Sequence, residues 1–521
     1  MFAVAALLLL NASLTFGNVW PTPKIRWETA LSVELAVCVL LLAVAHRRAE
    51  RLARSVLPVL WLLLVAGHYL DVTAPGLYGR DFNLYWDSRH LGNVAAMFAR
   101  AVPAWQIAAA VAGLAIVIAA VYLLARLALR HLAAAVQHRR ARLVLGAVAA
   151  LVIATFATQQ VTSFAPVRSA FADPAGGAYL RQARYVVAMV GTGGAAPVLG
   201  DSPDFGADLR GLDEADVVLV FLESYGAVTF DNPAFADALA ASRRNFEAGV
   251  NDADRELVSA YVESPTFGAS SWLAHLSLLS GVKVADQYAY TSLMASSRDT
   301  LVKAFARGGY RTVALMPGMR QPWPEGAFYG FDVIYGRDLL AYEGPEFGWW
   351  GIPDQFALAR LDALERSAAS RPPLFAVFPT STSHAPFGPV PPILPEWSRA
   401  LQRDAYRPAD VTSAVAPNLT DLAPSYLRAI AYGYDTLAAY IRAHAGENLV
   451  MVVIGDHQPP AAVSGRAAPR DVPVHVIASR PETLRRLRAS GFRPGLTPER
   501  SGVGEMHALV PMLLEAFGAR E

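Results

Sequence analysis

Apolar residues are concentrated in the first third of the chain. They form five apolar stretches, at residues 2–16, 29–45, 56–70, 105–125 and 143–158. A membrane-spanning helix needs about 20 such residues, which the fourth stretch provides outright and the others approach when their flanks are included. The pattern predicts an N-terminal bundle of about five transmembrane helices over residues 1–160, although the first stretch could instead be a signal peptide.

Arginines flank these stretches unevenly and predict their orientation. One group lies between the second and third stretches and consists of Arg47, Arg48, Arg51 and Arg54. The other lies around the loop between the fourth and fifth stretches and consists of Arg126, Arg130, Arg139, Arg140 and Arg142. By the positive-inside rule both loops are cytoplasmic. The fifth stretch then carries the rest of the chain out of the cytoplasm. The Ala- and Arg-rich composition fits a bacterium, so we expect a multi-pass protein of the cytoplasmic (inner) membrane with its larger part on the periplasmic or extracellular side.

The pattern changes twice after the last apolar stretch. Residues 161–211 are rich in Gly, Ala and Pro and contain one short apolar run at 185–190, which predicts a linker with a helix on the membrane surface. From residue 212 onwards, short β-branched runs alternate with longer amphipathic ones; the runs lie at 217–222, 312–316, 374–379, 449–454 and 474–478. Continuous apolar strands separated by helices predict a mostly parallel sheet covered by helices on both faces, here an α/β domain over 212–521.

Composition narrows the classes of function. The chain is 54% hydrophobic and 17% charged, against a charged share of about a quarter in soluble domains. A formal net charge of +1 gives no case for binding nucleic acid. Cys38 is the single cysteine, which excludes an intramolecular disulfide and a cysteine-rich zinc site.

Polar side chains follow three of the predicted strands. Glu223 ends the first, the pair Asp456-His457 ends the fourth, and His384 follows the third. In parallel α/β folds the ligand site lies beyond the carboxyl ends of the strands, so these side chains should meet at one rim. Oxygen ligands with a nitrogen suit one divalent metal ion, Mn²⁺ first, with Mg²⁺ or Zn²⁺ possible.

A nucleophile is expected in the segment SPTFGASSWLAHLSLLSG, residues 264–281. Its small residues allow a phosphate to approach the backbone, and the helix that follows offers free N–H groups. A hydroxyl held there beside a metal can ionise and attack phosphorus. An ordinary serine-rich helix cap is the alternative for the segment taken alone.

The motifs FLES (221–224), GDH (455–457) and TSHAPF (382–387) together resemble the sulfatase-like branch of the alkaline phosphatase superfamily. The predicted membrane layout is similar to that of lipoteichoic acid synthase and the envelope phosphoethanolamine and phosphoglycerol transferases. The resemblance implies Glu223, Asp456 and His457 as metal ligands and His384 as a catalytic residue on the substrate phosphate. Members of this branch place the nucleophile ten residues before a glycine that closes the helix, so with Gly281 in that place the resemblance implies Ser271 as the nucleophile and as a fourth metal ligand.

The resemblance leaves some positions open. Thr266 is the alternative nucleophile, because PTFGAS is similar to a threonine followed by glycine-rich sequence, and His275 falls where relatives carry a basic or polar helper. Arg320 and Trp323 are candidates for a head-group pocket, with a surface loop packed by tryptophan as the alternative. Asp354 and His475 recur in such domains and are interpreted as structural.

The segment Ser271-Trp272-Leu273-Ala274-His275 departs from the C/S-x-P/A-x-R motif of true sulfatases. That departure favours an unmodified hydroxyl and therefore phosphoryl transfer. We expect a membrane-anchored, metal-dependent transferase that moves a phosphoglycerol- or phosphoethanolamine-type group from a phospholipid donor to a glycan, lipid or polymer acceptor of the envelope. The alternatives are a phosphodiesterase or sulfatase-type hydrolase on the same fold, and a non-enzymatic sensor or assembly partner.

Overall fold

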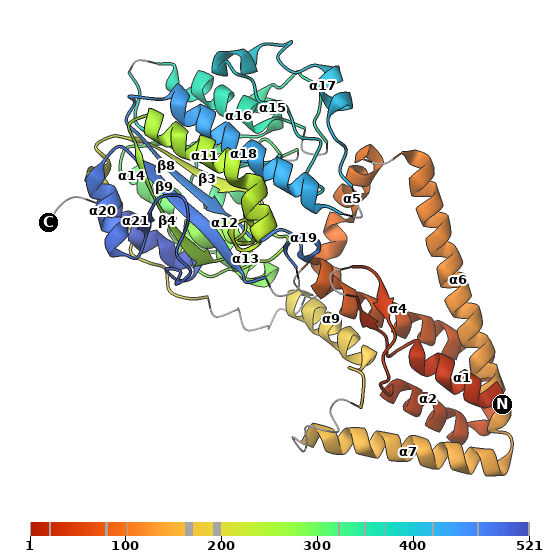
Figure 1. Ribbon diagram of the computed structural model, residues 1–521. Coiled ribbons are helices and arrows are strands. Elements are labelled where there is room, and N and C mark those ends of the chain that lie inside the picture. The colour runs from red at the N-terminus through yellow and green to blue at the C-terminus, as the bar shows by residue number, and fades with distance from the viewer. Residues whose placement is uncertain are drawn as a thin grey trace. The chain divides into compact units, whose positions relative to one another are not determined.

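The computed structural model describes residues 2–19, 22–78, 82–101, 103–161, 170–190, 199–320, 323–348, 351–368, 370–418, 421–465 and 468–518. The chain divides into two compact units, Met1–Gly194 and Ala195–Glu521 (Figure 1).

The first unit is helical. Its helices are α1 (Phe2–Ala12), α2 (Val33–Val44), α3 (Ala49–Arg54), α4 (Val56–Tyr78), α5 (Leu84–Ala101), α6 (Ala104–Ala135), α7 (Arg139–Val161) and α9 (Ala175–Val190), with a 3-10 turn at His46–Arg48 and a small ribbon of β1 (Gly17–Asn18) and β2 (Ile25–Arg26). The third, fourth and fifth predicted stretches lie on helices long and apolar enough to cross a membrane, at Val56–Pro75, Ala104–Ala135 and Arg139–Thr158. The first two stretches form α1 and α2, of 11 and 12 residues, shorter than the roughly 20 that a span needs. Five spans are therefore not confirmed; three are supported by length and composition among the described residues.

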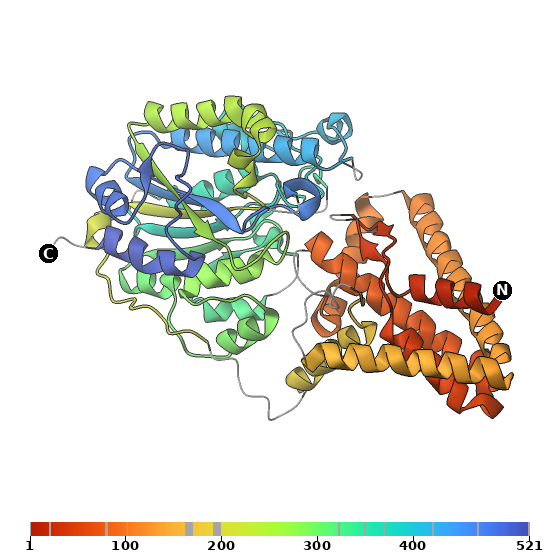
Figure 2. The same cartoon turned by 60° about the horizontal axis from the view of Figure 1, so that its bottom comes forward.

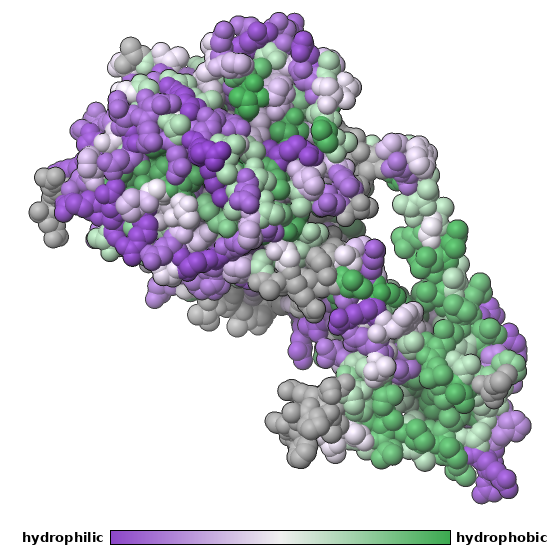
Figure 3. Space-filling view, viewed as in Figure 1, coloured by the Kyte–Doolittle hydropathy of each residue, from purple (hydrophilic) through white to green (hydrophobic). Residues whose placement is uncertain are grey.

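Helices α6 and α7 of this unit expose apolar side chains of the kind that contact lipid. In α6 none of the residues of the most apolar window is buried inside the protein, and hydrophobic residues gather over the α6 and α7 region in Figure 3. Exposed apolar surface of this extent marks an interaction site or a membrane-facing helix. A helix also satisfies its own backbone hydrogen bonds, as the hydrocarbon region requires.

The helix α9 occupies the middle of the predicted linker, whose residues 162–169 and 191–198 lie outside the described part. Three polar contacts hold α9 on the rest of its own unit. Arg181 forms an ion pair with Asp71, and the Tyr179 hydroxyl donates to the Leu63 carbonyl. The Gln182 amide donates to the Phe82 carbonyl at 2.6 Å. Leu180 and Val187 remain exposed on α9. The predicted helix is therefore present, and its position on a membrane surface stays a prediction.

The second unit is built on an eight-stranded sheet. The strand order is β10-β4-β9-β8-β3-β7-β5-β6, and the neighbours from β8 to β6 are parallel whereas β9, β4 and β10 pair antiparallel. The strands are β3 (Asp216–Leu222), β4 (Glu256–Glu263), β5 (Arg311–Leu315), β6 (Val333–Tyr335), β7 (Leu374–Pro379), β8 (Leu449–Gly455), β9 (Asp471–Ala478) and β10 (Arg493–Pro494). The expected mostly parallel α/β sheet is confirmed. The antiparallel edge with β4 was not predicted from the sequence.

Helices cover both faces of this sheet (Figures 1 and 2). Along the central strand β3, Val217, Leu219 and Phe221 belong to one core, and Val218, Val220 and Leu222 belong to the other. This alternation follows from the two-residue repeat of a strand, and it explains why the strand is apolar throughout. One core also contains residues of α12, α14, α20 and α21, the other residues of α11, α16 and α18.

The helices of this unit are α10 (Val228–Asp231), α11 (Pro233–Asp252), α12 (Ser271–Ser280), α13 (Gln287–Met294), α14 (Leu301–Arg307), α15 (Arg337–Leu340), α16 (Asp354–Leu361), α17 (Pro408–Ser413), α18 (Ala423–Ala443), α19 (Ala461–Ser464), α20 (Pro481–Ala489) and α21 (Leu509–Phe517). Single turns lie at Arg210–Leu212, Pro324–Phe328, Asp362–Arg366, Trp397–Leu401 and Met506–Ala508.

His475, on β9, is fully buried in a hydrogen-bonded network. Its Nδ1 lies 2.6 Å from the Ser259 hydroxyl and its Nε2 lies 2.9 Å from the Tyr225 hydroxyl, which in turn lies 2.5 Å from the Tyr434 hydroxyl. Burial, together with the charge of Arg243, lowers the pKa of His475 to about 3. The ring is therefore neutral in the folded protein near pH 7 and joins β9 to β4 and to the turn after β3.

The neutral His475 makes stability depend on pH. The pKa of His475 is about 3 in the folded state and about 6.5 in the unfolded state. Its contribution to the free energy of unfolding is therefore fully present above pH 6.5. This contribution decreases by about 1.4 kcal/mol per pH unit as the pH drops from 6.5 towards 3. We expect His475→Gln to flatten the pH dependence of the unfolding midpoint of the α/β unit between pH 6 and 4, measured on the purified full chain. Equal slopes in the two proteins would contradict this assignment.

Candidate active site

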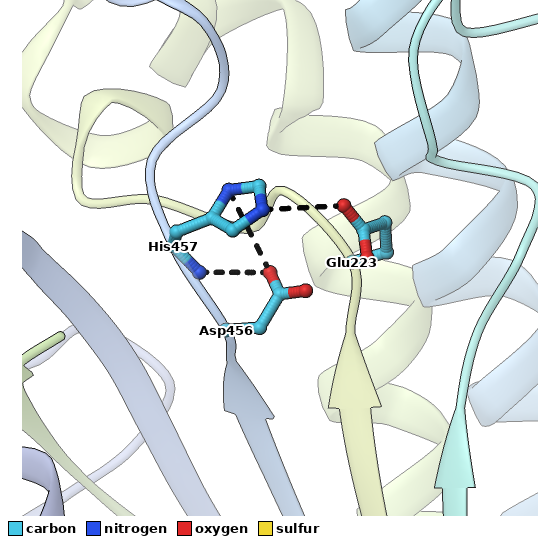
Figure 4. Close-up of side chains that lie close together, drawn as sticks. All are labelled: Glu223, Asp456 and His457. Carbon is cyan, nitrogen blue, oxygen red and sulfur yellow. Dashed lines mark hydrogen bonds and ion pairs between the residues drawn. The ribbon is translucent and has the colours of Figure 1, made fainter. Parts of the chain in front are cut away.

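Two neighbouring parallel strands end at the site. Leu222 of β3 pairs with Gly455 of β8, so the next residues, Glu223 and Asp456, leave the sheet side by side. Figure 4 shows their carboxylates and the His457 ring gathered above the two strand ends. All three residues are buried, and one ligand atom of each lies within 4.8 Å of the others.

Gly455 permits this close approach. A Cβ at this position would lie 1.9 Å from the carbonyl oxygen of Tyr225, a contact with backbone that a side-chain rotation cannot relieve. The turn after β3 therefore presses directly on the end of β8. This contact brings the residues after the two strands together.

The two carboxylates are oriented by backbone and hydroxyl groups. Asp456 Oδ1 accepts hydrogen bonds from the Ser224 amide at 2.8 Å and from the His457 amide at 2.7 Å. The Ser224 hydroxyl donates to Glu223 Oε1 at 3.1 Å, and the Glu223 amide donates to the Thr380 hydroxyl at 3.0 Å. These bonds fix the direction in which the remaining oxygens point.

His457 presents an unprotonated nitrogen to the cluster. Its Nδ1 lies 2.7 Å from the Gln458 carbonyl, which can only accept, so Nδ1 carries the ring proton. The Nε2 lone pair then faces Glu223 Oε1 at 3.5 Å and Ser271 Oγ at 3.1 Å. A backbone carbonyl that fixes the tautomer in this way is the usual partner of a metal-binding histidine.

Ser271 is the first residue of α12 and reaches the same point. Its hydroxyl donates to Glu223 Oε2 at 2.9 Å. The preceding Ser270 adopts a left-handed conformation with a φ of 70°, which turns the chain into the helix. The hydroxyl thus stands at a helix N-terminus, where backbone N–H groups favour anions such as phosphate.

The charges of the cluster fit a cation. Burial, together with the negative charge of Asp456, raises the pKa of Glu223 well above its usual value. Burial acts in the same direction on Asp456, but His457 and His275 lower its pKa overall. Asp456 Oδ2 is buried and has no hydrogen-bond partner among the described residues. A divalent ion would neutralise the two carboxylates and satisfy this oxygen, so the residues present fit a metal held by Glu223, Asp456, His457 and Ser271.

His384 lies in the turn after β7, on a small pocket shared with Ser381, Thr382 and Gly351. Asp354, at the start of α16, holds this turn by accepting the amides of Ser381 at 2.8 Å and Thr382 at 3.1 Å. Burial lowers the pKa of His384 to about 4, so its ring is neutral near pH 7. Its Nδ1 lies 2.9 Å from the Ala385 carbonyl and therefore carries the proton.

The other predicted residues make different contacts. The Thr266 hydroxyl lies 3.5 Å from the Ser264 hydroxyl, and Ser264 in turn donates to the Asp456 carbonyl. Arg320 pairs with Glu346 at 3.3 Å, and Trp323 packs against Tyr329 with ring centroids 5.2 Å apart. The structure thus brings Ser271, rather than Thr266, into hydrogen-bonding contact with the carboxylate cluster. The catalytic and substrate-binding roles of these residues stay predictions.

Residues beside the predicted ones complete the site. Ser224 and Thr380 orient Glu223 and Asp456, and the sequence analysis did not single them out. Ser224 (φ 59°), Ser270 (φ 70°) and Phe387 (φ 67°) all have left-handed backbone conformations within a few residues of Glu223, Ser271 and His384. Such strained residues concentrate at functional sites.

Comparisons with known proteins concern mainly the α/β domain. Residues 217–475 match the family model described as Sulfatase. No curated protein matches the chain.

Similar solved structures include an alkaline phosphatase superfamily protein from Vibrio parahaemolyticus, at 16% identity over 58% of this chain and 66% of that one, with a TM-score of 0.39. Another is the lipoteichoic acid synthase LtaP from Listeria monocytogenes, at 15% identity over 65% and 80% of the two chains and a TM-score of 0.35. A third is the lipooligosaccharide phosphoethanolamine transferase A from Neisseria meningitidis, at 17% identity over 91% and 88% and a TM-score of 0.46.

Residues 217–475, just under half of the chain, are thus similar to the sulfatase family. This match supports an enzyme that acts on phosphate or sulfate esters.

The close contact at Gly455 gives a test of the site. Gly455→Ala should push the Tyr225 carbonyl away from β8 and separate Glu223 from Asp456. We expect a loss of Mn²⁺ affinity of about tenfold or more, together with a lower unfolding midpoint. Isothermal titration and thermal unfolding of the full chain measure the two effects. Gly200→Ala is the matched control, because a Cβ there meets no atom within 4 Å; equal metal affinity in both variants would contradict the argument.

Proposed function

We propose that the protein is a metal-dependent transferase that moves a substituted phosphate group from a phospholipid to an acceptor of the bacterial envelope, with Ser271 as the covalent nucleophile. The observation that carries this proposal is the position of the Ser271 hydroxyl, at 2.9 Å from Glu223 and 3.1 Å from His457 at the start of α12. The donor class is a glycerophospholipid with a phosphoglycerol- or phosphoethanolamine-type head group.

The first half-reaction follows from the arrangement of the side chains. A divalent ion held by Glu223, Asp456 and His457, Mn²⁺ by preference, would favour ionisation of the Ser271 hydroxyl and neutralise charge on the phosphate. Ser271 Oγ then attacks phosphorus, the bond from phosphorus to the diacylglycerol oxygen breaks, and that oxygen takes up a proton. The N–H groups at the start of α12 hold the phosphate oxygens during this exchange. The product is a phosphoserine that carries the head group.

The second half-reaction needs an acceptor hydroxyl and a base. His384 keeps its Nδ1 proton on the Ala385 carbonyl, so its Nε2 is the atom able to take the proton of the acceptor. The protonated ring can then donate to the phosphate oxygens, which is the charge-stabilising role expected from the sequence. Asp354 supports His384 by fixing the turn that carries it. Release of Ser271 completes a ping-pong cycle.

Two features favour transfer over hydrolysis and over sulfate chemistry. The three helices able to cross a membrane keep the chain beside its lipid donor. Ser271-Trp272-Leu273-Ala274-His275 also lacks the motif in which a sulfatase nucleophile is modified. A hydrolase with water as acceptor is the second candidate, because it would use the same nucleophile and metal ligands.

Intact mass measurement tests the function directly. The full chain is incubated with Mn²⁺ and vesicles of phosphatidylglycerol or phosphatidylethanolamine, and Ser271→Ala and Thr266→Ala are treated in parallel. We expect an adduct of phosphoglycerol or phosphoethanolamine mass in the wild type and in Thr266→Ala, and none in Ser271→Ala. Loss of the adduct only in Thr266→Ala would transfer the nucleophile to Thr266. Release of the group only to water, with an added alcohol left unmodified, would favour the hydrolase.

The proposed site requires the α/β unit to lie on the periplasmic side of the inner membrane. In a Cys38→Ala background, Glu396→Cys places a thiol on an exposed position of that unit, and Glu50→Cys places one among the first group of arginines. A membrane-impermeant maleimide should label Glu396→Cys in spheroplasts and Glu50→Cys only after lysis. The opposite labelling pattern would place the catalytic unit in the cytoplasm and exclude an envelope acceptor.

A further inference from the structure

Tyr426, near the start of α18, holds the turn that follows β3. Its hydroxyl donates a hydrogen bond to the Ser224 carbonyl at 3.0 Å. The side chain is fully buried, and burial raises the pKa of Tyr426 well above its usual value, so the hydroxyl keeps its proton. The same carbonyl accepts the Gly226 amide at 3.1 Å. The turn is therefore tied to α18 at the residue directly after Glu223.

Ser224 connects this hydrogen bond to both carboxylates of the site. Its amide donates to Asp456 Oδ1 at 2.8 Å, and its hydroxyl donates to Glu223 Oε1 at 3.1 Å. Its left-handed conformation, with a φ of 59°, is unfavourable for serine and persists only where surrounding contacts hold it. Without the hydrogen bond from Tyr426, one fewer contact holds Ser224 in the orientation that directs the two carboxylates.

The ring of Tyr426 packs on the turn that carries His384. Phe387 meets this ring edge to face, with centroids 5.2 Å apart and ring planes at 74°. Phe387 is fully buried, and its amide donates to the His384 carbonyl at 2.8 Å, which closes the turn. One side chain of α18 thus contacts both the turn after β3 and the turn after β7.

We propose that Tyr426 is a positioning residue that fixes these two turns relative to each other, through its hydroxyl on one and its ring on the other. The inference rests on the proposed function, in which the two contacts serve different half-reactions. The hydroxyl acts through Ser224 on the two carboxylates, and therefore on metal binding and formation of the phosphoserine. The ring acts through Phe387 on His384, and therefore on transfer to the acceptor.

Two single substitutions separate these contacts. Tyr426→Phe removes only the hydroxyl, and Phe387→Leu removes the ring on which Tyr426 packs. We expect Tyr426→Phe to lower both Mn²⁺ affinity and the rate of phosphoserine formation about fivefold, with transfer from the preformed phosphoserine unchanged. Phe387→Leu should slow that transfer and leave Mn²⁺ affinity unchanged. Isothermal titration of the full chain measures the affinity. Single-turnover mass measurement with phosphatidylglycerol vesicles, followed by added glycerol, measures the two rates.

Tyr440→Phe is the matched control. Tyr440 is another fully buried tyrosine of α18, and its hydroxyl donates at 3.3 Å to Asp362, in the turn at 362–366. This variant should lower the unfolding midpoint, because it also loses a buried hydrogen bond, without changing Mn²⁺ affinity or either rate. Equal Mn²⁺ affinity in Tyr426→Phe and Tyr440→Phe would reduce Tyr426 to a structural role and overturn the proposal. Slower transfer in Tyr426→Phe, or weaker Mn²⁺ binding in Phe387→Leu, would overturn the separation of the two contacts.

Failure of the proposed function gives a different result. If the wild type binds Mn²⁺ but forms no phosphoserine, the proposed function fails together with the role of the ring in transfer. A lower Mn²⁺ affinity in Tyr426→Phe alone would still support the role of the hydroxyl. A wild type that binds no Mn²⁺ would overturn both the positioning role and the metal-dependent mechanism.

Discussion

The burial of two carboxylates at adjacent strand ends is the constraint on which the rest of the site depends. Glu223 and Asp456 are forced together because Leu222 and Gly455 are paired in the sheet and because Gly455 lets the turn after β3 rest on β8. Two negative charges removed from water at this distance are unfavourable by several kcal/mol unless they are neutralised. Hydrogen bonds offset this cost in part, since Asp456 Oδ1 accepts hydrogen bonds from two amides and Glu223 accepts hydrogen bonds from two hydroxyls. The negative charge that remains on the two carboxylates is directed at one point.

The sequence was sufficient to predict the parts of the molecule that local pattern determines. The apolar run before Glu223 and the one before Asp456 each read as a buried strand, and both end where the pattern indicated. The carboxyl-end rule for parallel sheets then placed the two acids and His457 at one rim. The third, fourth and fifth apolar stretches likewise form helices able to cross a membrane.

Other features depend on contacts that no local pattern reveals. Strand β4 (Glu256–Glu263) carries a serine and a tyrosine in its interior and so forms no continuous apolar run, and its pairing with β9 emerges only in the folded sheet. Ser224 is one of many serines, and its role in orienting Glu223 and Asp456 depends on the left-handed turn that follows β3. The distinction between Ser271 and Thr266 is also three-dimensional. Both follow β4 within a few residues of each other, and only the direction of α12 turns the Ser271 hydroxyl towards Glu223.

The side chains of the carboxylate cluster and those of the adjacent pocket come from different kinds of structural element. The groups of the carboxylate cluster and Ser271 are attached to the ends of β3 and β8 and to the start of α12, and residues of these elements belong to the hydrophobic cores. The groups around the adjacent pocket come instead from the connections that precede α16 and follow β7, among them Phe347, Ile352 and His384. Insertions or substitutions in those connections leave the strand pairing untouched. In the proposed transferase, the recognised group can therefore change in evolution while the carboxylate cluster and Ser271 stay the same.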